Sequence, residues 1–275
     1  MSGEAFFKMC GSGNDFVFLD GRHTDPGRWP ASRIARVCAR ATGIGADGLV
    51  ILAPGSAPGM VRFHFFNSDG SRGEMCGNAA LCATRLSAML GLANPADVRL
   101  ETDAGPVRGT ADPTGGPRAE LVLPDVQVGQ SPDVAPAAGE VQAGFAVVGV
   151  PHLVVPVREV DAVDLRARGR ELRFHPAVGP AGANVNFVAE TRAGWVMRTY
   201  ERGVEGETLA CGTGAVACAI VLASRGQVTL PWSVTSRAGS VLTVAGVVAP
   251  NGALRSPRLA GEARLVFQGA IGPDE

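Results

Sequence analysis

One unit of sequence occurs twice in this chain and limits what the chain can fold into. Residues 61–66, VRFHFF, and residues 195–200, WVMRTY, both place apolar side chains on one face, as strands do. A polar, glycine-containing loop follows each strand and ends at a Cys-Gly pair, at 76–77 in the first copy and at 211–212 in the second. Because duplication of a whole supersecondary unit explains such a repeat economically, the sequence predicts two related halves.

Each Cys-Gly pair opens an alanine-rich apolar run that is typical of a buried helix. The first run stops at Gly91 and the second at Gly226, and glycine is common just past the end of a helix. The second run is apolar on almost every side, which indicates a helix enclosed by its own half. The sequence therefore predicts an α/β (α+β) chain in which each half combines strands with a buried helix.

The length of 275 residues is also typical of two domains. The proline-rich stretch 124–137, PDVQVGQSPDVAPA, is the candidate linker, and the strand-like stretch 262–271 is the candidate for a return to the first half. We therefore expect an N-terminal half of residues 1–124 plus 259–275 and a C-terminal half of residues 125–258.

Composition excludes several classes of function. The 25 basic and 26 acidic side chains give a net charge of −1, without the basic stripe that binds nucleic acids or anionic membranes. The sequence shows no charged leader with an apolar core, and no apolar run of about 20 residues. We therefore expect a cytoplasmic protein with no nucleic-acid or membrane partner and with six free cysteines.

The two Cys-Gly pairs place a thiol where a helix favours negative charge. A helix N-terminus presents unpaired N–H groups and roughly half a positive charge, so a cysteine there is shifted toward the thiolate. The glycine that follows lets its amide approach a bound carboxylate closely. Cys76 with residues 77–78, and Cys211 with residues 212–213, each offer a proton-transfer group beside an anion-binding segment.

Two acid/base groups on opposite sides of one carboxylate-bearing carbon are what inversion of configuration requires. One thiolate takes the Cα proton, and the other thiol delivers a proton to the opposite face. Lys8 is the only lysine, so a Schiff base with pyridoxal phosphate has one candidate. A cofactor-independent enzyme relies instead on oriented amides, worth about 10²–10³ in rate per donor, and on general bases worth about 10²–10⁴.

Other interpretations apply to single cysteines and to weaker motifs. A lone cysteine before a buried helix is commonly a small core residue, and Cys10, Cys38, Cys82 and Cys218 fit that interpretation. Matching places in a repeat favour chemistry for the other two. The GSGNDF segment at 11–16 lacks the third glycine of a dinucleotide fingerprint, and no phosphate loop, metal-ligand spacing or nucleophile elbow occurs. We therefore expect no metal and no cofactor.

Motifs along nearly the whole chain resemble those of the diaminopimelate epimerase family. The matching segments are KMCGSGNDFVFLD at 8–20, GIGADGL at 43–49, FNSDGSRGEMCGN at 66–78, GVPHLVV at 149–155, GANVNFV at 182–188 and YERGVEGETLACGTGA at 200–215. The resemblance implies epimerisation of LL-2,6-diaminopimelate to the meso form, without pyridoxal phosphate, in lysine and peptidoglycan precursor synthesis. It also implies two similar halves, each a curled mixed sheet around a central helix, an active site in the cleft between them, and a homodimer.

The resemblance also implies roles for individual residues. It implies that Cys76 and Cys211 are the catalytic pair and that His152 and Glu201 tune their thiols. The residues implied to hold the reacting carboxylate through their amides are Gly77, Asn78, Gly212 and Thr213. The residues implied to bind the amino and carboxylate groups of the small-molecule substrate are Asn14, Asn67, Asn184, Glu201 and Arg202.

The residue types suit these roles, and each also has a plain structural alternative. Arg202 can pair with a carboxylate through two hydrogen bonds, and asparagine both donates and accepts, as a zwitterion demands. An asparagine beside glycine or aspartate, such as Asn14 or Asn78, is otherwise a turn residue. His152, which follows a proline, is otherwise a surface loop residue, and Glu201 with its neighbour is otherwise a solvated ion pair.

Three positions depart from the family pattern. Val150 stands where an asparagine often touches substrate, so one distal contact is missing or moved. Gly48 stands where some members carry glutamine, and Cys10 stands where histidine is usual, which adds a third thiol.

Two other functions stay open at this point. One is a proline or hydroxyproline racemase of the same fold, whose single-headed substrate would leave Arg202 and the asparagines without a purpose. The other is a non-catalytic thiol redox or binding protein, in which a reversible Cys76–Cys211 disulfide would be the working state.

Overall fold

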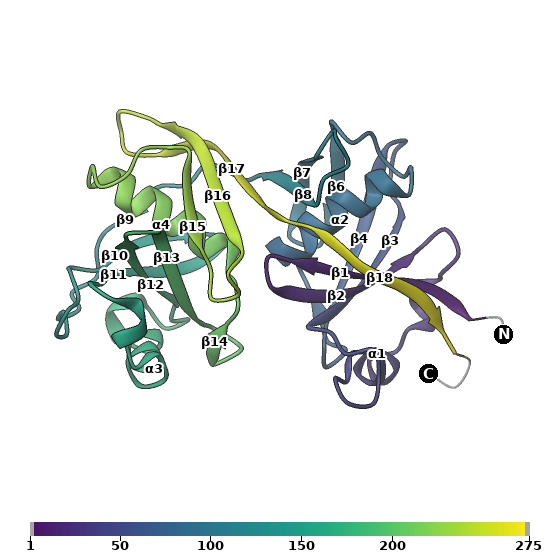
Figure 1. Cartoon of the computed structure of the whole chain (residues 1–275), viewed down its shortest axis with the longest axis horizontal. Helices are drawn as coiled ribbons and strands as arrows, with labels where there is room; N and C mark the ends of the chain where they lie inside the picture. The colour runs from purple at the N-terminus through teal and green to yellow at the C-terminus, as the bar shows by residue number, and fades with distance from the viewer. Residues whose placement is uncertain (1–2, 273–275) are drawn as a thin grey trace. The chain divides into compact units, whose positions relative to one another are not determined.

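The computed structural model describes residues 3–272, which divide into two units (Figure 1). Unit 1 comprises residues 3–121 and 260–272, and unit 2 comprises Val122–Leu259. The chain therefore passes from unit 1 to unit 2 once and returns once. Within residues 3–272, no helix is both long enough and apolar enough to cross a membrane.

Unit 1 is a mixed sheet with one long central helix and one shorter helix (Figure 1). Its strands are β1 Glu4–Gly11, β2 Asn14–Asp20, β3 Gly48–Pro54, β4 Met60–Asn67, β5 Arg72–Gly73, β6 Val98–Thr102, β7 Gly105–Ala111, β8 Arg118–Val122 and β18 Arg264–Ile271. Its helices are α1 Ala31–Cys38 and α2 Gly77–Met89, with the short 3₁₀ helix η1 Pro26–Arg28. β1 forms an antiparallel hairpin with β2, β3 is parallel to β2, β4 is antiparallel to β3, and β6 is parallel to β4.

Unit 2 repeats this order of elements. Its strands are β9 Val128–Gly129, β10 Gly144–Val148, β11 Val150–Pro156, β12 Asn184–Thr191, β13 Gly194–Glu201, β14 Gly206–Thr208, β15 Trp232–Thr235, β16 Val241–Val248 and β17 Leu254–Glu262. Its helices are α3 Arg170–Arg173 and α4 Gly212–Ser224, with the short helices η2 Val160–Ala162, η3 Leu165–Gly169 and η4 Pro176–Val178. β10 and β11 form the hairpin, β12 is parallel to β11, β13 is antiparallel to β12, and β15 is parallel to β13. The two units therefore share one topology, as the repeat in the sequence predicts.

The central strands β2, β3 and β12 are buried on both faces, because their residues alternate between two apolar cores. In unit 1, Val17 and Leu49 pack with Ile34 of α1, while their neighbours along the strands point to the opposite face. In unit 2, Val185 packs with Leu172 of α3 in the same way. The central helices α2 and α4 are buried along most of their length, which is why both sequences are rich in alanine and other small apolar residues.

The predicted strands and helices of the repeat are confirmed. Residues 61–66 lie in β4 and residues 195–200 lie in β13, and each run that follows a Cys-Gly pair is helical. Gly91 and Gly226 stand just past the helix ends with φ of 68° each, a conformation that favours glycine.

The prediction of a linker at 124–137 is wrong. Val126 forms a bridge with Leu254, Val134 is buried in the core of unit 2, and β9 pairs with β10. The prolines and glycines of this stretch lie in an extended segment. The segment packs on unit 2 because the apolar residues between them are buried there. β18, which covers most of the strand-like stretch 262–271, pairs with β1 along its length.

Candidate active site

Cys76 occupies the N-cap of α2 in unit 1. Its backbone is extended, with φ of −133° and ψ of 123°, and its carbonyl oxygen accepts the first helical hydrogen bond from the Ala80 amide at 2.8 Å. The residue is half-buried, and a Cβ built on Gly77 would meet nothing within 4 Å. The thiol therefore stands at the positive end of the helix macrodipole, beside an amide with open space next to it.

Cys211 occupies the same place at α4 in unit 2. Its φ of −135° and ψ of 104° nearly match those of Cys76, and its carbonyl oxygen accepts from the Ala215 amide at 3.0 Å. The Cys211 sulfur lies 3.6 Å from the Thr213 hydroxyl, and the residue is 6% exposed. The two cysteines thus have matching backbone positions, each built by the same order of strand, loop and helix in its own unit.

Asn14 and Asn78 meet next to the start of α2. The Asn78 side-chain amide donates to Asn14 Oδ1 at 2.7 Å, and Asn14 in turn donates to Asp47 Oδ2 at 2.9 Å. Asn78 is buried, so it is a packed residue of the helix start and not the turn residue of the alternative interpretation. The Asp47 carboxylate, which precedes β3, therefore holds Asn14 of β2, and Asn14 in turn holds Asn78 of α2.

Lys8 serves the structure of this network. Its ammonium lies 2.7 Å from Asp15 Oδ2 and also donates to the Gly45 carbonyl, and the residue is buried. Burial would raise the pKa of the Asp15 carboxyl, but the hydrogen bonds from Arg40 and Lys8 outweigh burial and lower it. The only lysine of the chain is therefore engaged as a structural cation.

Asn67 ends β4 and is exposed. Its side chain donates to Ser71 Oγ at 3.0 Å within the hairpin loop, and Gly48 of β3 stands opposite it. A Cβ on Gly48 would come within 2.6 Å of the Phe66 carbonyl oxygen, so the close approach of these strands requires glycine.

Asn184 and Arg202 are joined in unit 2. The Arg202 amide donates to Asn184 Oδ1 at 2.7 Å, which fixes the start of the loop that follows β13. Glu201 ends β13 and both Glu201 and Arg202 are half-buried. The fully solvated ion pair of the alternative interpretation is therefore not what the structure shows.

His152 is fully buried in β11, so the alternative of a surface loop residue is wrong. Burial, with a smaller contribution from the positive charge of Arg202, lowers its pKa to about 3. The imidazole is therefore neutral at physiological pH. Its Nδ1 lies 3.2 Å from Asn186 Nδ2, a residue that the sequence analysis did not select. Asn184 and Asn186 share one face of β12, and this two-residue spacing is the signal that could have found the second one.

The strand registers define corresponding positions in the two units. Asn67 and Glu201 each end the strand before the hairpin loop. Gly48 stands opposite Asn67, and continuing the β12–β13 register by one residue places Asn184 opposite Glu201. Gly48 and Asn184 therefore correspond. Gly48, which departs from the family pattern, thus occupies in unit 1 the position that the predicted binding residue Asn184 occupies in unit 2.

The same register relates β2 to β11. Phe16 pairs with Gly48, and His152 pairs with Asn184, so Phe16 and His152 correspond. Two residues earlier, Val150 is the counterpart of Asn14. Two of the three departures, Gly48 and Val150, thus lie where the opposite unit carries an asparagine.

Of the remaining thiols, Cys38, Cys82 and Cys218 are core residues, whereas Cys10 is half-buried. Burial raises the pKa of Cys38 to about 11, and burial also raises the pKa of Cys82 and Cys218 inside the two central helices. Burial raises the pKa of Cys10 as well, and its sulfur lies 3.9 Å from the Glu262 carboxylate. Within residues 3–272, none of the six cysteines forms a disulfide.

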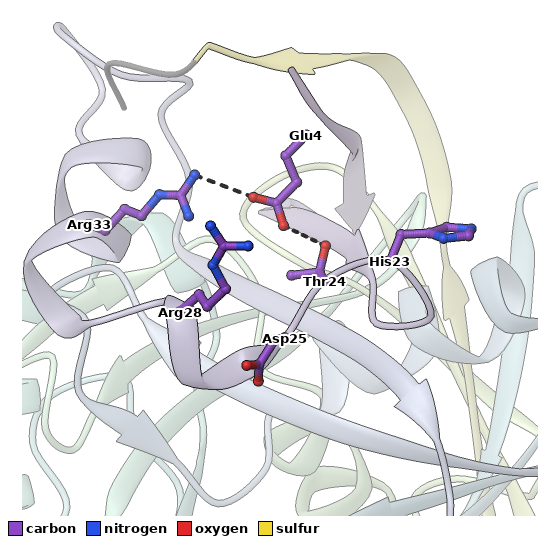
Figure 2. A pocket seen from close by; sticks show the side chains of 6 residues that line it. All are labelled: Glu4, His23, Thr24, Asp25, Arg28 and Arg33. Carbon is purple, nitrogen blue, oxygen red and sulfur yellow. Dashed lines mark hydrogen bonds and ion pairs between the residues drawn. The ribbon is translucent and has the colours of Figure 1, made fainter. Parts of the chain in front are cut away.

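A separate cavity of about 300 Å³ lies in unit 1, and no predicted site residue lines it (Figure 2). The Glu4 carboxylate at its centre accepts hydrogen bonds from Thr24 at 2.5 Å and from Arg33 at 3.3 Å. The Arg33 guanidinium also stacks on Trp29, 3.9 Å from the ring centroid. Two of the charged groups that line this cavity, Glu4 and Arg33, are therefore engaged with one another.

Known structures share this fold at low sequence identity. A probable proline racemase from Agrobacterium radiobacter K84 superposes with a TM-score of 0.70 at 18% identity, covering 98% of this chain and 93% of that one. A phenazine biosynthesis protein of the PhzF family from Bacillus anthracis superposes with a TM-score of 0.73 at 14% identity, covering 99% and 100%. The fold thus defines the class of this protein: two pseudo-symmetric halves, each a mixed sheet around a central helix. In this chain a cysteine caps each central helix.

Sequence comparison gives the family within this class. The profile of diaminopimelate epimerase matches residues 6–121 and 144–251. The diaminopimelate epimerase of Gemmatimonas aurantiaca is 45% identical over 277 aligned residues, which cover 97% of this chain and 99% of that protein. The enzyme of that name from Aquifex aeolicus is 41% identical, with 87% and 88% covered. The chain belongs to the diaminopimelate epimerase family, a family of isomerases.

Proposed function

We propose that this chain converts LL-2,6-diaminopimelate to meso-diaminopimelate, without pyridoxal phosphate, in the synthesis of lysine and peptidoglycan precursors. Family membership over most of the chain supports the substrate. The proline racemase likeness, at 18% identity, concerns the fold alone. The observation that carries the chemistry is the pair of cysteines with matching backbone conformation, each at the N-cap of a buried helix.

In the proposed mechanism, Cys76 and Cys211 act on opposite faces of one α-carbon. The thiolate of one cysteine takes the Cα proton and becomes a thiol, while the thiol of the other donates its proton to the opposite face and becomes a thiolate. Reversal of the two roles gives the reverse reaction. The electron pair of the broken C–H bond is delocalised onto the carboxylate and then forms the new C–H bond, so no external oxidant or reductant is needed.

The amides at the two helix starts stabilise the charge that develops on the carboxylate. We assign this role to Gly77, Asn78, Gly212 and Thr213, because the N–H groups of a helix's first turn point toward an anion at the helix start and stabilise it without reorganising. The open space beside Gly77 supports it.

The proposed substrate-binding side chains are Asn14, Asn67, Asn184, Glu201 and Arg202. Hydrogen bonds hold Asn14 to Asp47 and Asn184 to the Arg202 amide, so these groups are oriented before a ligand arrives. Arg202 would form the bidentate pair with the distal carboxylate. His152 and Glu201 are assigned to tuning the thiols. Because a working thiol must stay reduced, we place the enzyme in the cytoplasm.

Isotope exchange tests the function directly. We expect incubation with LL-diaminopimelate in D₂O, with no pyridoxal phosphate or metal added, to place deuterium at one Cα and to yield both the LL and meso forms. Exchange with proline and none with diaminopimelate would instead assign the chain to the racemases.

Cysteine variants complete this experiment. Cys76→Ala and Cys211→Ala should each lose turnover by about 10²-fold or more while remaining folded, because each removes one of two required proton carriers. The matched controls are Cys82→Ala and Cys218→Ala, which change a buried thiol inside the same helices and should retain activity. Activity retained in either Cys76→Ala or Cys211→Ala would exclude the two-base mechanism. A Cys76–Cys211 disulfide as the stable state, without turnover, would favour the redox alternative.

A further inference from the structure

Three polar side chains lie buried together in unit 2. His152 of β11, Asn186 of β12 and Thr199 of β13 are each at most 2% exposed. Asn186 Nδ2 lies 3.2 Å from His152 Nδ1 and 3.2 Å from the Leu153 carbonyl oxygen, and Thr199 donates to Asn186 Oδ1 at 3.0 Å. Among residues 3–272, His152 Nε2 finds no hydrogen-bond partner although it is buried.

The partners of Asn186 fix where the imidazole carries its proton. A carbonyl oxygen only accepts, so the group of Asn186 that faces Leu153 must be the amide nitrogen, which only donates. The same nitrogen faces His152 Nδ1, so Nδ1 must accept. A neutral imidazole that accepts at Nδ1 carries its proton at Nε2. The buried atom without a partner is therefore an N–H donor.

Unit 1 shows that the fold does not need these polar groups. The residues at the corresponding register positions are all apolar: Phe16, Val50 and Phe65. They are also buried, and the rings of Phe16 and Phe65 pack edge to face with centroids 6.3 Å apart. Because apolar side chains fill the same positions in the same topology, the polar cluster of unit 2 calls for a reason other than packing.

We propose that Asn186 is a positioning residue that holds His152 in the Nε2–H tautomer, so that the imidazole acts in the reaction as a single N–H donor and not as a base. Asn186 also packs against the first turn of α4, next to Gly214. The space beside Gly214 is so narrow that an added Cβ would lie 2.2 Å from Asn186 Oδ1 and 3.2 Å from the Cys211 sulfur. One side chain thus touches both the imidazole and the first turn of the helix that carries a reactive thiol.

This role deepens the proposed function and rests on it for its catalytic part. A neutral N–H donor stabilises an anionic acceptor, a thiolate or a carboxylate, without adding a charge that would repel the nearby Arg202. A histidine acting as a base would need a free lone pair on the ring, and the Asn186 amide occupies the one at Nδ1.

The tautomer can be read by nuclear magnetic resonance of the unmodified enzyme. A two-bond ¹H–¹⁵N correlation spectrum at neutral pH separates Nε2–H, Nδ1–H and doubly protonated imidazoles, and the signal that disappears in His152→Gln is that of His152. We expect the Nε2–H pattern. An Nδ1–H or imidazolium pattern for His152 would overturn the proposal whatever the variants do.

Asn186→Asp then tests whether the tautomer matters. The aspartate carboxylate has the same shape as the amide, but it cannot donate a hydrogen bond to Nδ1 and can only accept one from it. His152 should therefore change to the Nδ1–H or imidazolium pattern. We expect kcat to fall by about 100-fold with little change in KM. The matched control is Thr199→Val, which removes another hydrogen bond of Asn186 and should keep the Nε2–H pattern and most of the activity. A changed pattern in Asn186→Asp with kcat within about 2-fold of the parent would overturn the positioning role. A loss of kcat in Thr199→Val equal to that in Asn186→Asp would overturn it as well.

Absence of deuterium exchange in the parent enzyme would refute the proposed function, while the spectrum would still decide the tautomer.

Discussion

At the scale of single residues, burial and charged neighbours together decide which titratable groups are ionised. His152 occupies a position where unit 1 has a phenylalanine, and the surrounding sheet excludes water from it. The imidazole is therefore kept neutral, whereas the Asp15 carboxyl of unit 1 stays ionised because Lys8 and Arg40 face it. Residue type alone does not separate these cases, because both are titratable groups at strand positions.

The neutral state of His152 predicts a pH dependence of stability. Its pKa is about 3 in the folded chain against 6.5 for an unperturbed histidine, so between these values the unfolded chain binds a proton that the folded chain does not. The free energy of unfolding should therefore fall as pH falls from 6.5, with a contribution from His152 of about 1.4 kcal/mol per pH unit. Urea unfolding of the parent and of His152→Phe at several pH values checks this, because the variant should show the shallower slope. Parallel curves for the two proteins would contradict it.

At the scale of elements, the hairpin loop before Cys211 contains one residue with an unusual backbone conformation. In unit 2 the loop includes Glu205, which has a φ of 53° although it is not glycine. Its carboxylate accepts from Arg173 of α3 at 3.0 Å and from the Gly203 amide at 3.1 Å. Arg173 also donates to the Ala181 carbonyl at 3.2 Å. This arginine therefore ties together the loops that lead into Asn184 and out of Glu201.

Two substitutions at Glu205 separate its bonding from its backbone strain. Glu205→Ala loses the hydrogen bonds and keeps a side chain in the left-handed region, whereas Glu205→Gly loses the same bonds and relieves that strain. We expect both to unfold at lower urea than the parent, and Glu205→Gly to be more stable than Glu205→Ala by about 1 kcal/mol. If the two variants have equal stability, the left-handed conformation is not a source of strain in this loop.

At the scale of the whole molecule, we propose that the chain forms a homodimer, as expected from its family resemblance. Two pairs of neighbouring apolar side chains are exposed, Val247 with Val248 on β16 and Val266 with Phe267 on β18. Neighbours along a strand point to opposite faces, so on each strand one of the two side chains is available to a surface that a second copy of the chain covers.

Sedimentation velocity checks the oligomeric state. We expect a species of twice the mass of one chain across a wide range of protein concentration. Val248→Lys and Val266→Lys, examined separately, should show which surface is used, because a charge placed in the interface favours the monomer. A parent protein that sediments as a monomer at every concentration would refute the proposed dimer.

The sequence by itself determined the repeat and the place of its two cysteines at helix starts. Local rules were sufficient for this, since strand alternation, a Cys-Gly pair at a helix start and a glycine past its end concern neighbours along the chain, as at Cys76 and Gly91. The family motifs added the substrate. The stretch 124–137 was misjudged because its proline content describes backbone preference and not what its valines can pack against.

Only the tertiary structure decided which side chains share an environment. The burial of His152, its pairing with Asn186 and the correspondence of both to apolar residues of unit 1 depend on strand registers that join residues far apart in the chain. Burial and the donor and acceptor roles of hydrogen-bonding groups are set by such non-local neighbours, so no local pattern could have given the protonation state of this imidazole.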